Sequence, residues 1–175
     1  MKPDQELADL DVALQRIDGL LGSEASDWTR RRDDVSNWSV AEQVDHMLRS
    51  LVRMLSAADM IRVGYDARIK PDGKASVPGR LLLRAGAIPR GRAEAPEEVL
   101  PAEAPTVDDC RERYEAVLGL LAALAPHLET MRTWRGTIPH PLLGDFRAQD
   151  WLRFARMHTE HHLAIVDDIL GVAAG

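Results

Sequence analysis

The sequence contains a single cysteine and no long hydrophobic run. Because Cys110 is the only cysteine in 175 residues, no disulfide can form within the chain, which fits a reducing, cytoplasmic setting. No apolar stretch approaches the ~18 residues of a membrane span, and the N-terminus lacks the apolar core of a secretory signal. These absences exclude a disulfide-stabilised scaffold and predict a soluble protein without a membrane partner.

Positive charge is also in deficit. The formal net charge is −6, with 22 Lys and Arg residues against 28 Asp and Glu residues. Nucleic acids are bound by basic surfaces, so this balance argues against nucleic acid as the main partner. A hydrophobic content of 45% is sufficient for one ordinary core. We therefore expect a single domain that spans residues 1–175.

Four segments carry apolar residues at steps of three and four, which is the spacing of amphipathic helices. The expected helices cover residues 7–21, 39–63, 106 to the region of Pro126, and 148–170. Ser39 and Glu42 form a capping box that starts the second helix. No segment shows the alternation typical of a strand. The proline-rich stretch 65–105 is expected to cross the other helices and to hold a short helix near 77–84. The fold class predicted is all-α, a four-helix bundle with long crossover connections.

The last expected helix carries three histidines within five residues. His158 and His162 are four residues apart, so they lie one turn apart on one face, and both fall on the apolar stripe. Leaving the polar atoms of a buried imidazole unmet costs about 1–3 kcal/mol. One metal ion would satisfy both rings. Hydrogen bonds to neighbouring carbonyls or carboxylates are the alternative, and the spacing alone leaves both open.

A third ligand has to come from another helix, and His46 is the best-placed histidine. Its position is about 140° from the centre of the apolar stripe of its helix, at ~100° per residue, which by itself indicates an exposed side chain. A polar cavity beside Gln43, Ser50 and Ala57 is the alternative environment. Periodicity therefore leaves the role of His46 open.

Three more residues are weaker candidates for the same site. His161 adjoins the pair but lies about a quarter turn away, so it either supports the ligands or packs beside a loop. His140, which precedes the last helix, is a candidate for the mouth of the site or an ordinary loop histidine. Glu42, one turn before His46, is a candidate catalytic base, although the capping box already accounts for it.

Two motifs occur in order along the chain, about a hundred residues apart: Trp38-Ser39-x-x-Glu42-x-x-x-His46-Met and His158-x-x-His161-His162-Leu. Together with His140-Pro141-x-x-Gly144 and Trp151, they resemble the DinB/YfiT-like superfamily of small metal-binding proteins. The resemblance implies a four-helix bundle in which three histidines hold one divalent metal ion. It assigns these ligands to His46, His158 and His162.

The resemblance also implies a type of chemistry. Relatives include enzymes that use low-molecular-weight thiols, isomerases and hydrolase-like proteins, and many are homodimers. Three imidazoles suit zinc, nickel or iron, and three protein ligands leave open positions, as in catalytic sites. The expected function is activation of a low-molecular-weight thiol for S-transfer or isomerisation of a small-molecule substrate. Metal-dependent hydrolysis and non-catalytic binding of a metal or ligand under stress are the alternatives.

Overall fold

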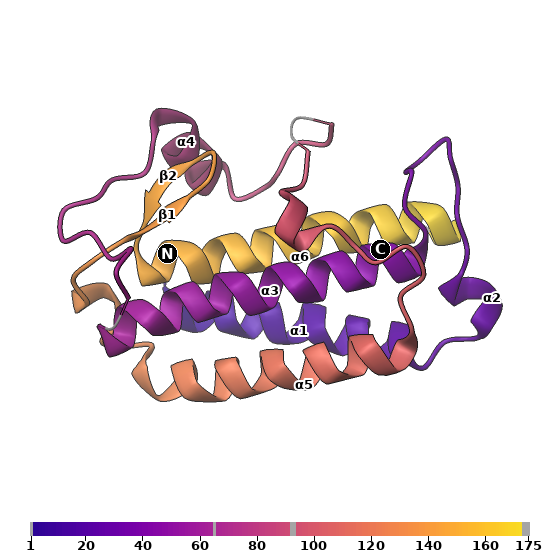
Figure 1. The fold of residues 1–175 in the computed structure, drawn as a ribbon, viewed down its shortest axis with the longest axis horizontal. Helices are drawn as coiled ribbons and strands as arrows, with labels where there is room; N and C mark the ends of the chain where they lie inside the picture. Colours follow the sequence, from indigo (N-terminus) through magenta and orange to yellow (C-terminus); the bar gives the residue numbers. More distant parts are fainter. Residues whose placement is uncertain (1, 65, 92–93, 173–175) are drawn as a thin grey trace.

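The computed structural model describes residues 2–64, 66–91 and 94–172, and four long helices run side by side within it (Figure 1). These helices are α1 (Pro3–Leu21), α3 (Val40–Val63), α5 (Val107–Leu124) and α6 (Ala148–Leu170). Each covers one of the four segments expected from periodicity. The prediction of a mainly helical protein is therefore confirmed.

The ends of the helices follow from local sequence. The capping box at the start of α3 is present, with the amide of Ser39 donating to Glu42 Oε2 at 2.7 Å. Gly64 ends α3 in the left-handed conformation, with φ of 74°, which glycine adopts without a steric penalty. Thr106 caps α5 by accepting from the amide of Asp109. These devices fix where the site-bearing helices begin and end.

The shorter elements are α2 (Ala25–Trp28), α4 (Val77–Ala85), the 3₁₀ turns η1 (Glu97–Val99), η2 (Ala125–His127) and η3 (Met131–Thr133), and the strands β1 (Ile138–His140) and β2 (Gly144–Phe146). The short helix expected near 77–84 is confirmed as α4. The expectation of no strand is wrong, because β1 and β2 form an antiparallel pair in which Ile138 lies opposite Phe146. Each strand has three residues, too few for alternation to show, and β1 contains Pro139.

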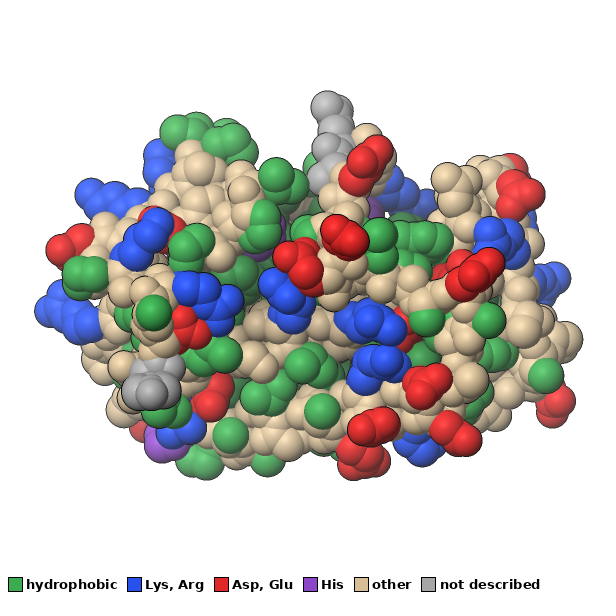
Figure 2. Space-filling model, viewed as in Figure 1, with side chains coloured by type: hydrophobic (Ala, Val, Ile, Leu, Met, Phe, Trp, Pro, Cys, Tyr) green, Lys and Arg blue, Asp and Glu red, His purple; other side chains and the backbone are tan. Residues whose placement is uncertain are grey.

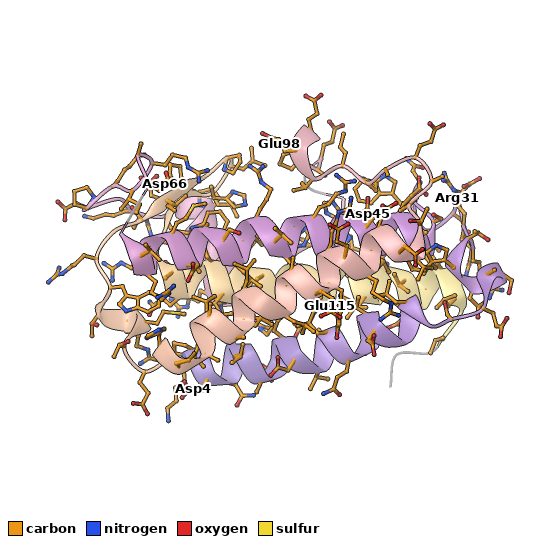
Figure 3. The ribbon with its side chains drawn as sticks, turned by 60° about the horizontal axis from the view of Figure 1, so that its bottom comes forward. Asp4, Arg31, Asp45, Asp66, Glu98 and Glu115 are labelled. Carbon is orange, nitrogen blue, oxygen red and sulfur yellow. The ribbon has the colours of Figure 1, made fainter. Side chains whose placement is uncertain are left out.

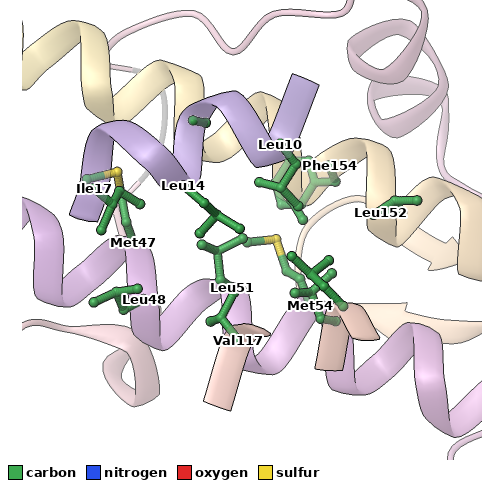
Figure 4. Close-up of a cluster of buried hydrophobic side chains, with 14 of the residues drawn as sticks. Leu10, Leu14, Ile17, Met47, Leu48, Leu51, Met54, Val117, Leu152 and Phe154 are labelled. Carbon is green, nitrogen blue, oxygen red and sulfur yellow. The ribbon is translucent and has the colours of Figure 1, made fainter. Parts of the chain in front are cut away.

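The core lies between the long helices. α3 packs against both α5 and α6, and α1 packs mainly against α6. Figure 4 shows side chains of α1, such as Leu14, next to Leu51 of α3, with Val117 of α5 and Leu152 of α6 in the same cluster. Burial of a leucine side chain of this kind contributes about 1.5–3 kcal/mol. This apolar cluster holds α3 and α6 side by side.

A buried ion-pair cluster also fixes α6. Glu6 of α1 is 3% exposed, and its two carboxylate oxygens accept from Arg153 at 2.7 Å and from Arg156 at 2.6 Å. Arg156 is also paired with Glu160 one turn later. Charge-assisted hydrogen bonds of this kind are stronger and more directional than neutral ones. They set the position of the helix that carries His158 and His162.

The connection between α3 and α5 crosses the outer face of α3 and α6 instead of taking a short path. It places α4 against α6 and η1 against α3 (Figure 1). This connection, called the crossover below, therefore covers the polar face of α3.

None of the helices in the described part of the chain combines the length and hydropathy that a membrane span requires.

Candidate metal centre

The three histidines assigned as ligands lie together. His46 of α3 faces His158 and His162 of α6, and one ring nitrogen from each lies within 4.8 Å of the others. Nε2 of His46 is 3.2 Å from Nε2 of His158, and the ring centroids are 4.5–5.0 Å apart. No second cluster of three metal-ligating side chains occurs among the described residues.

Two of the rings are oriented by hydrogen bonds on their far side. Nδ1 of His46 donates to the carbonyl oxygen of Val99 at 2.7 Å, and Nδ1 of His162 donates to Oε1 of Gln43 at 2.7 Å. Because both partners are acceptors, each Nδ1 carries the proton and each Nε2 presents a lone pair. Histidine ligands of metal ions are commonly fixed in this manner.

The centre as a whole fits a divalent cation. Burial lowers the pKa of His46, His158 and His162, so the imidazoles are neutral and able to act as ligands. Nδ1 of His158 is buried and has no hydrogen-bond partner among the described residues. Lone pairs that converge within a few ångströms repel one another unless a proton or a cation lies between them. A metal ion held by one nitrogen of each ring would remove this repulsion.

Gln43 offers a test of how the ligands are oriented. Replacing Gln43 with leucine removes the acceptor for His162 Nδ1, and we expect metal affinity to fall by about 10- to 100-fold, as for other partners of metal-bound histidines. Gln43→Glu keeps an acceptor oxygen at the same position, now as a carboxylate, and should retain most of the affinity. Competition with a chromogenic chelator measures both variants. Equal affinity of Gln43→Leu and wild type would contradict this role.

The histidines form part of the floor of an open cleft of about 780 Å³. One wall is the face of α3 that runs from His46 to Met60, and the other wall is the crossover with the β1–β2 turn. Most of the lining is apolar, and Figure 2 shows histidine surface inside the hollow beside the crossover. Open coordination positions would therefore face a space large enough for a small molecule.

Comparison of the sequence with known protein families agrees with this geometry. A family model of the DinB superfamily matches residues 8–166. The chain belongs to the DinB superfamily. Searches of curated proteins and of solved structures found no match. The matched DinB region contains all three histidines of the centre, and membership together with the cluster supports metal binding.

His140 of the DinB chain lies in the wall of this cleft, among Phe146, Trp151 and Phe154. Its Nδ1 accepts from the amide of Leu142 at 3.2 Å, so the proton of the neutral ring is on Nε2. Burial lowers the pKa of His140 to about 4. His140 therefore stays uncharged near pH 7 and offers the cleft a hydrogen-bond donor.

This pKa predicts a pH dependence of stability. An unfolded histidine titrates near 6.5, whereas folded His140 titrates near 4. Between these values the unfolded chain binds more protons than the folded chain. The contribution of neutral His140 to the unfolding free energy is therefore complete above about pH 6.5 and is lost as the pH falls toward 4. We expect His140→Phe to reduce the fall in unfolding free energy over this range by about 2 kcal/mol. Urea unfolding of both proteins at several pH values measures the slopes, and parallel slopes would refute the assignment.

The two other candidates of the DinB site have different surroundings. His161 lines the cleft, with its ring 5.0 Å from that of His162 and a hydrogen bond to the backbone of Ile88, but it is not part of the three-histidine cluster. Glu42 Oε2 accepts from Ser39 and from Arg31, and Glu42 is not part of the cleft lining. The geometry gives Glu42 a capping role, and its catalytic role stays a prediction.

Sequence reasoning missed the partners of the ligands. Gln43 precedes His46 by three residues, so it lies on the same face of α3, and this spacing is a signal that could have found it. Val99 contributes only its backbone carbonyl from a distant turn. No pattern of side chains marks such a carbonyl.

Proposed function

We propose that the protein is a metal-dependent enzyme that activates a low-molecular-weight thiol at the three-histidine centre for S-transfer or isomerisation. The observation that carries the proposal is the convergence of three neutral imidazoles on the floor of an open cleft. When bound there, zinc, nickel or iron would lower the pKa of a thiol on its open side. The packing of the long helices supports a DinB-type four-helix bundle, and a homodimer is part of the proposal.

The residues around the centre support such chemistry in three ways. Trp38 packs on His46 with ring centroids 4.8 Å apart, which shields the centre from water. The apolar cleft walls favour a small molecule with an apolar body. His140 places an uncharged donor in the wall, where it can hydrogen-bond an oxygen of the electrophile. The chain thus binds, orients and desolvates the reactants.

A direct assay tests this function. Metal-loaded protein is mixed with N-acetylcysteine and 1-chloro-2,4-dinitrobenzene, a pair in which a carbon–sulfur bond forms and chloride leaves. We expect product, followed by absorbance, to form faster with wild type than with His158→Ala at equal concentration. Equal rates for the two proteins over a panel of thiols and electrophiles would refute thiol activation.

Two alternative functions would use the same three-histidine centre. Hydrolysis by a metal-activated water predicts turnover of p-nitrophenyl acetate without a thiol, because the open positions are equally available to water. A non-catalytic binding protein predicts bound metal without turnover of either substrate. The capping role of Glu42 favours it, because Oε2 of this candidate base is already engaged with Ser39 and Arg31. The same two assays, with metal content measured in parallel, separate these cases.

A further inference from the structure

A second pocket, of about 630 Å³, lies at the end of the molecule where α6 begins. Its walls are the turn that spans 71–74, the segment that spans 132–137, and Arg147. No residue lines both this pocket and the metal cleft. In Figure 1 these loops occupy the end near the first turn of α6, and Figure 2 shows several Lys and Arg side chains there.

The floor of this pocket is held firmly. Lys70 and Thr137 exchange two backbone hydrogen bonds of 2.9 Å, and the Thr137 hydroxyl donates to the Lys70 carbonyl at 3.1 Å. Gly73 packs so closely on Thr137 and Asp145 that an added Cβ would lie 2.0 Å from Thr137 Oγ1 and 2.7 Å from the Cβ of Asp145. The turn therefore keeps its place because glycine has no side chain. The pocket is a preformed feature of the fold.

The lining is strongly cationic in a chain whose net charge is −6. It contains Lys74, Arg132, Arg135 and Arg147, against the single carboxylate of Asp72. Lys74, Arg135 and Arg147 form no ion pair with any acidic residue in the described part of the chain, whereas neighbouring Lys70 pairs with Asp145 at 2.9 Å. These three cations, gathered without acidic partners in the described chain, raise the local positive potential.

Two further features add to this potential and to the shape of the pocket. Arg147 is the residue before the first turn of the 23-residue helix α6, so the positive end of the helix dipole lies beside the pocket. Trp134, half-buried in the wall, adds a flat apolar surface. A ligand that suits these groups combines a compact, multiply charged anion with a ring or other apolar part.

We propose that this pocket binds a small phosphate monoester. The phosphate dianion matches several cations better than a carboxylate does, and guanidinium groups bind phosphate oxygens in pairs. The apolar body of the ester packs on Trp134. The inference stands apart from the metal centre, because the two sites share no residue and neither requires the other.

The test uses phenyl phosphate as the probe and isothermal titration calorimetry of the full chain as the measurement. We expect saturable binding to wild type, with the dissociation constant raised about tenfold or more in the double variant Arg135→Gln/Arg147→Gln. Lys74→Gln should weaken binding as well. The same titration with His158→Ala, which should lack metal at the other site, should give the wild-type dissociation constant, because the two sites share no residue.

The controls distinguish a specific binding site from nonspecific attraction between charges. Arg84→Gln removes the same charge from an exposed, unpaired arginine of the described chain outside the pocket, and it should leave the dissociation constant unchanged. Phenol, which has the same ring without phosphate, should not bind. Inorganic phosphate should bind more weakly than phenyl phosphate if the ring packs on Trp134. Equal weakening by Arg84→Gln, equal binding of phenol, or no binding of phenyl phosphate to wild type would overturn the proposal.

Discussion

Replacing His158 with alanine is expected to abolish stoichiometric metal binding. Wild-type protein should carry about one divalent ion per chain, and the variant close to none, because the two remaining imidazoles are too few protein ligands to hold the ion. His158 approaches His46 to 3.2 Å between the Nε2 atoms, so its removal opens the centre of the cluster. Elemental analysis of the two purified proteins after identical metal loading measures the difference.

The matched control for this result is His161→Ala. His161 lies on the same helix and lines the same cleft, but it is not part of the three-histidine cluster, so this variant should retain the ion. It removes one imidazole from the same histidine-rich run, and it therefore corrects for weak binding by histidine-rich surfaces. Metal loss from His161→Ala equal to that from His158→Ala would sink the assigned ligand set. Similar near-zero metal in wild type would sink the centre itself.

Much of the fold was predictable because local rules governed it. The four long helices follow from apolar spacing, and the start of α3 follows from Ser39 and Glu42, whose capping box forms as predicted. The pair His158 and His162 was predictable for the same reason, since a spacing of four places two side chains on one helical face. Each of these inferences depends on contacts within one helix.

The position of His46 was not predictable from periodicity. Its angular position indicated exposure, yet the structure leaves it only 2% exposed. The reason is tertiary: α6 and the crossover cover the polar face of α3, so every residue from 40 to 48 is buried. His46 faces a cleft, as the alternative held, but most of the lining of that cleft is apolar. Gln43, Ser50 and Ala57 are buried on the same helix. The strands escaped prediction because three-residue segments are set by their pairing and not by their own pattern.

The crossover has two functions that its sequence does not reveal. It forms a wall of the cleft, and through the carbonyl of Val99 it orients His46. A backbone carbonyl can serve as a precise acceptor only if its segment is fixed, and η1 has three residues with few internal hydrogen bonds. Something outside η1 must therefore hold it in place.

Asp45 is the residue that holds this segment, and replacing it with alanine is the second large effect that we expect. Asp45 is fully buried, and its Oδ2 accepts from the amide of Ala102 at 2.8 Å and from Arg49 at 2.7 Å. Its Oδ1 lies 3.1 Å from Arg113 Nη1 of α5. Figure 3 shows Asp45 on α3 beneath the crossing segment, with Glu98 of η1 pointing away to solvent. Asp45 thus joins α3, α5 and the crossover beside a metal ligand.

Asp45→Ala should lower the unfolding free energy by about 3 kcal/mol, since the change leaves Arg49, Arg113 and the amide of Ala102 without their buried acceptor. It should also weaken metal binding by about tenfold, because Val99 is then free to move away from His46. Asp45→Asn separates the two effects: its amide oxygen can still accept from Ala102, so metal affinity should largely recover while stability does not. Urea unfolding of metal-free protein and chelator competition measure the two quantities. Loss of stability in Asp45→Ala with unchanged metal affinity would show that the crossover does not orient His46.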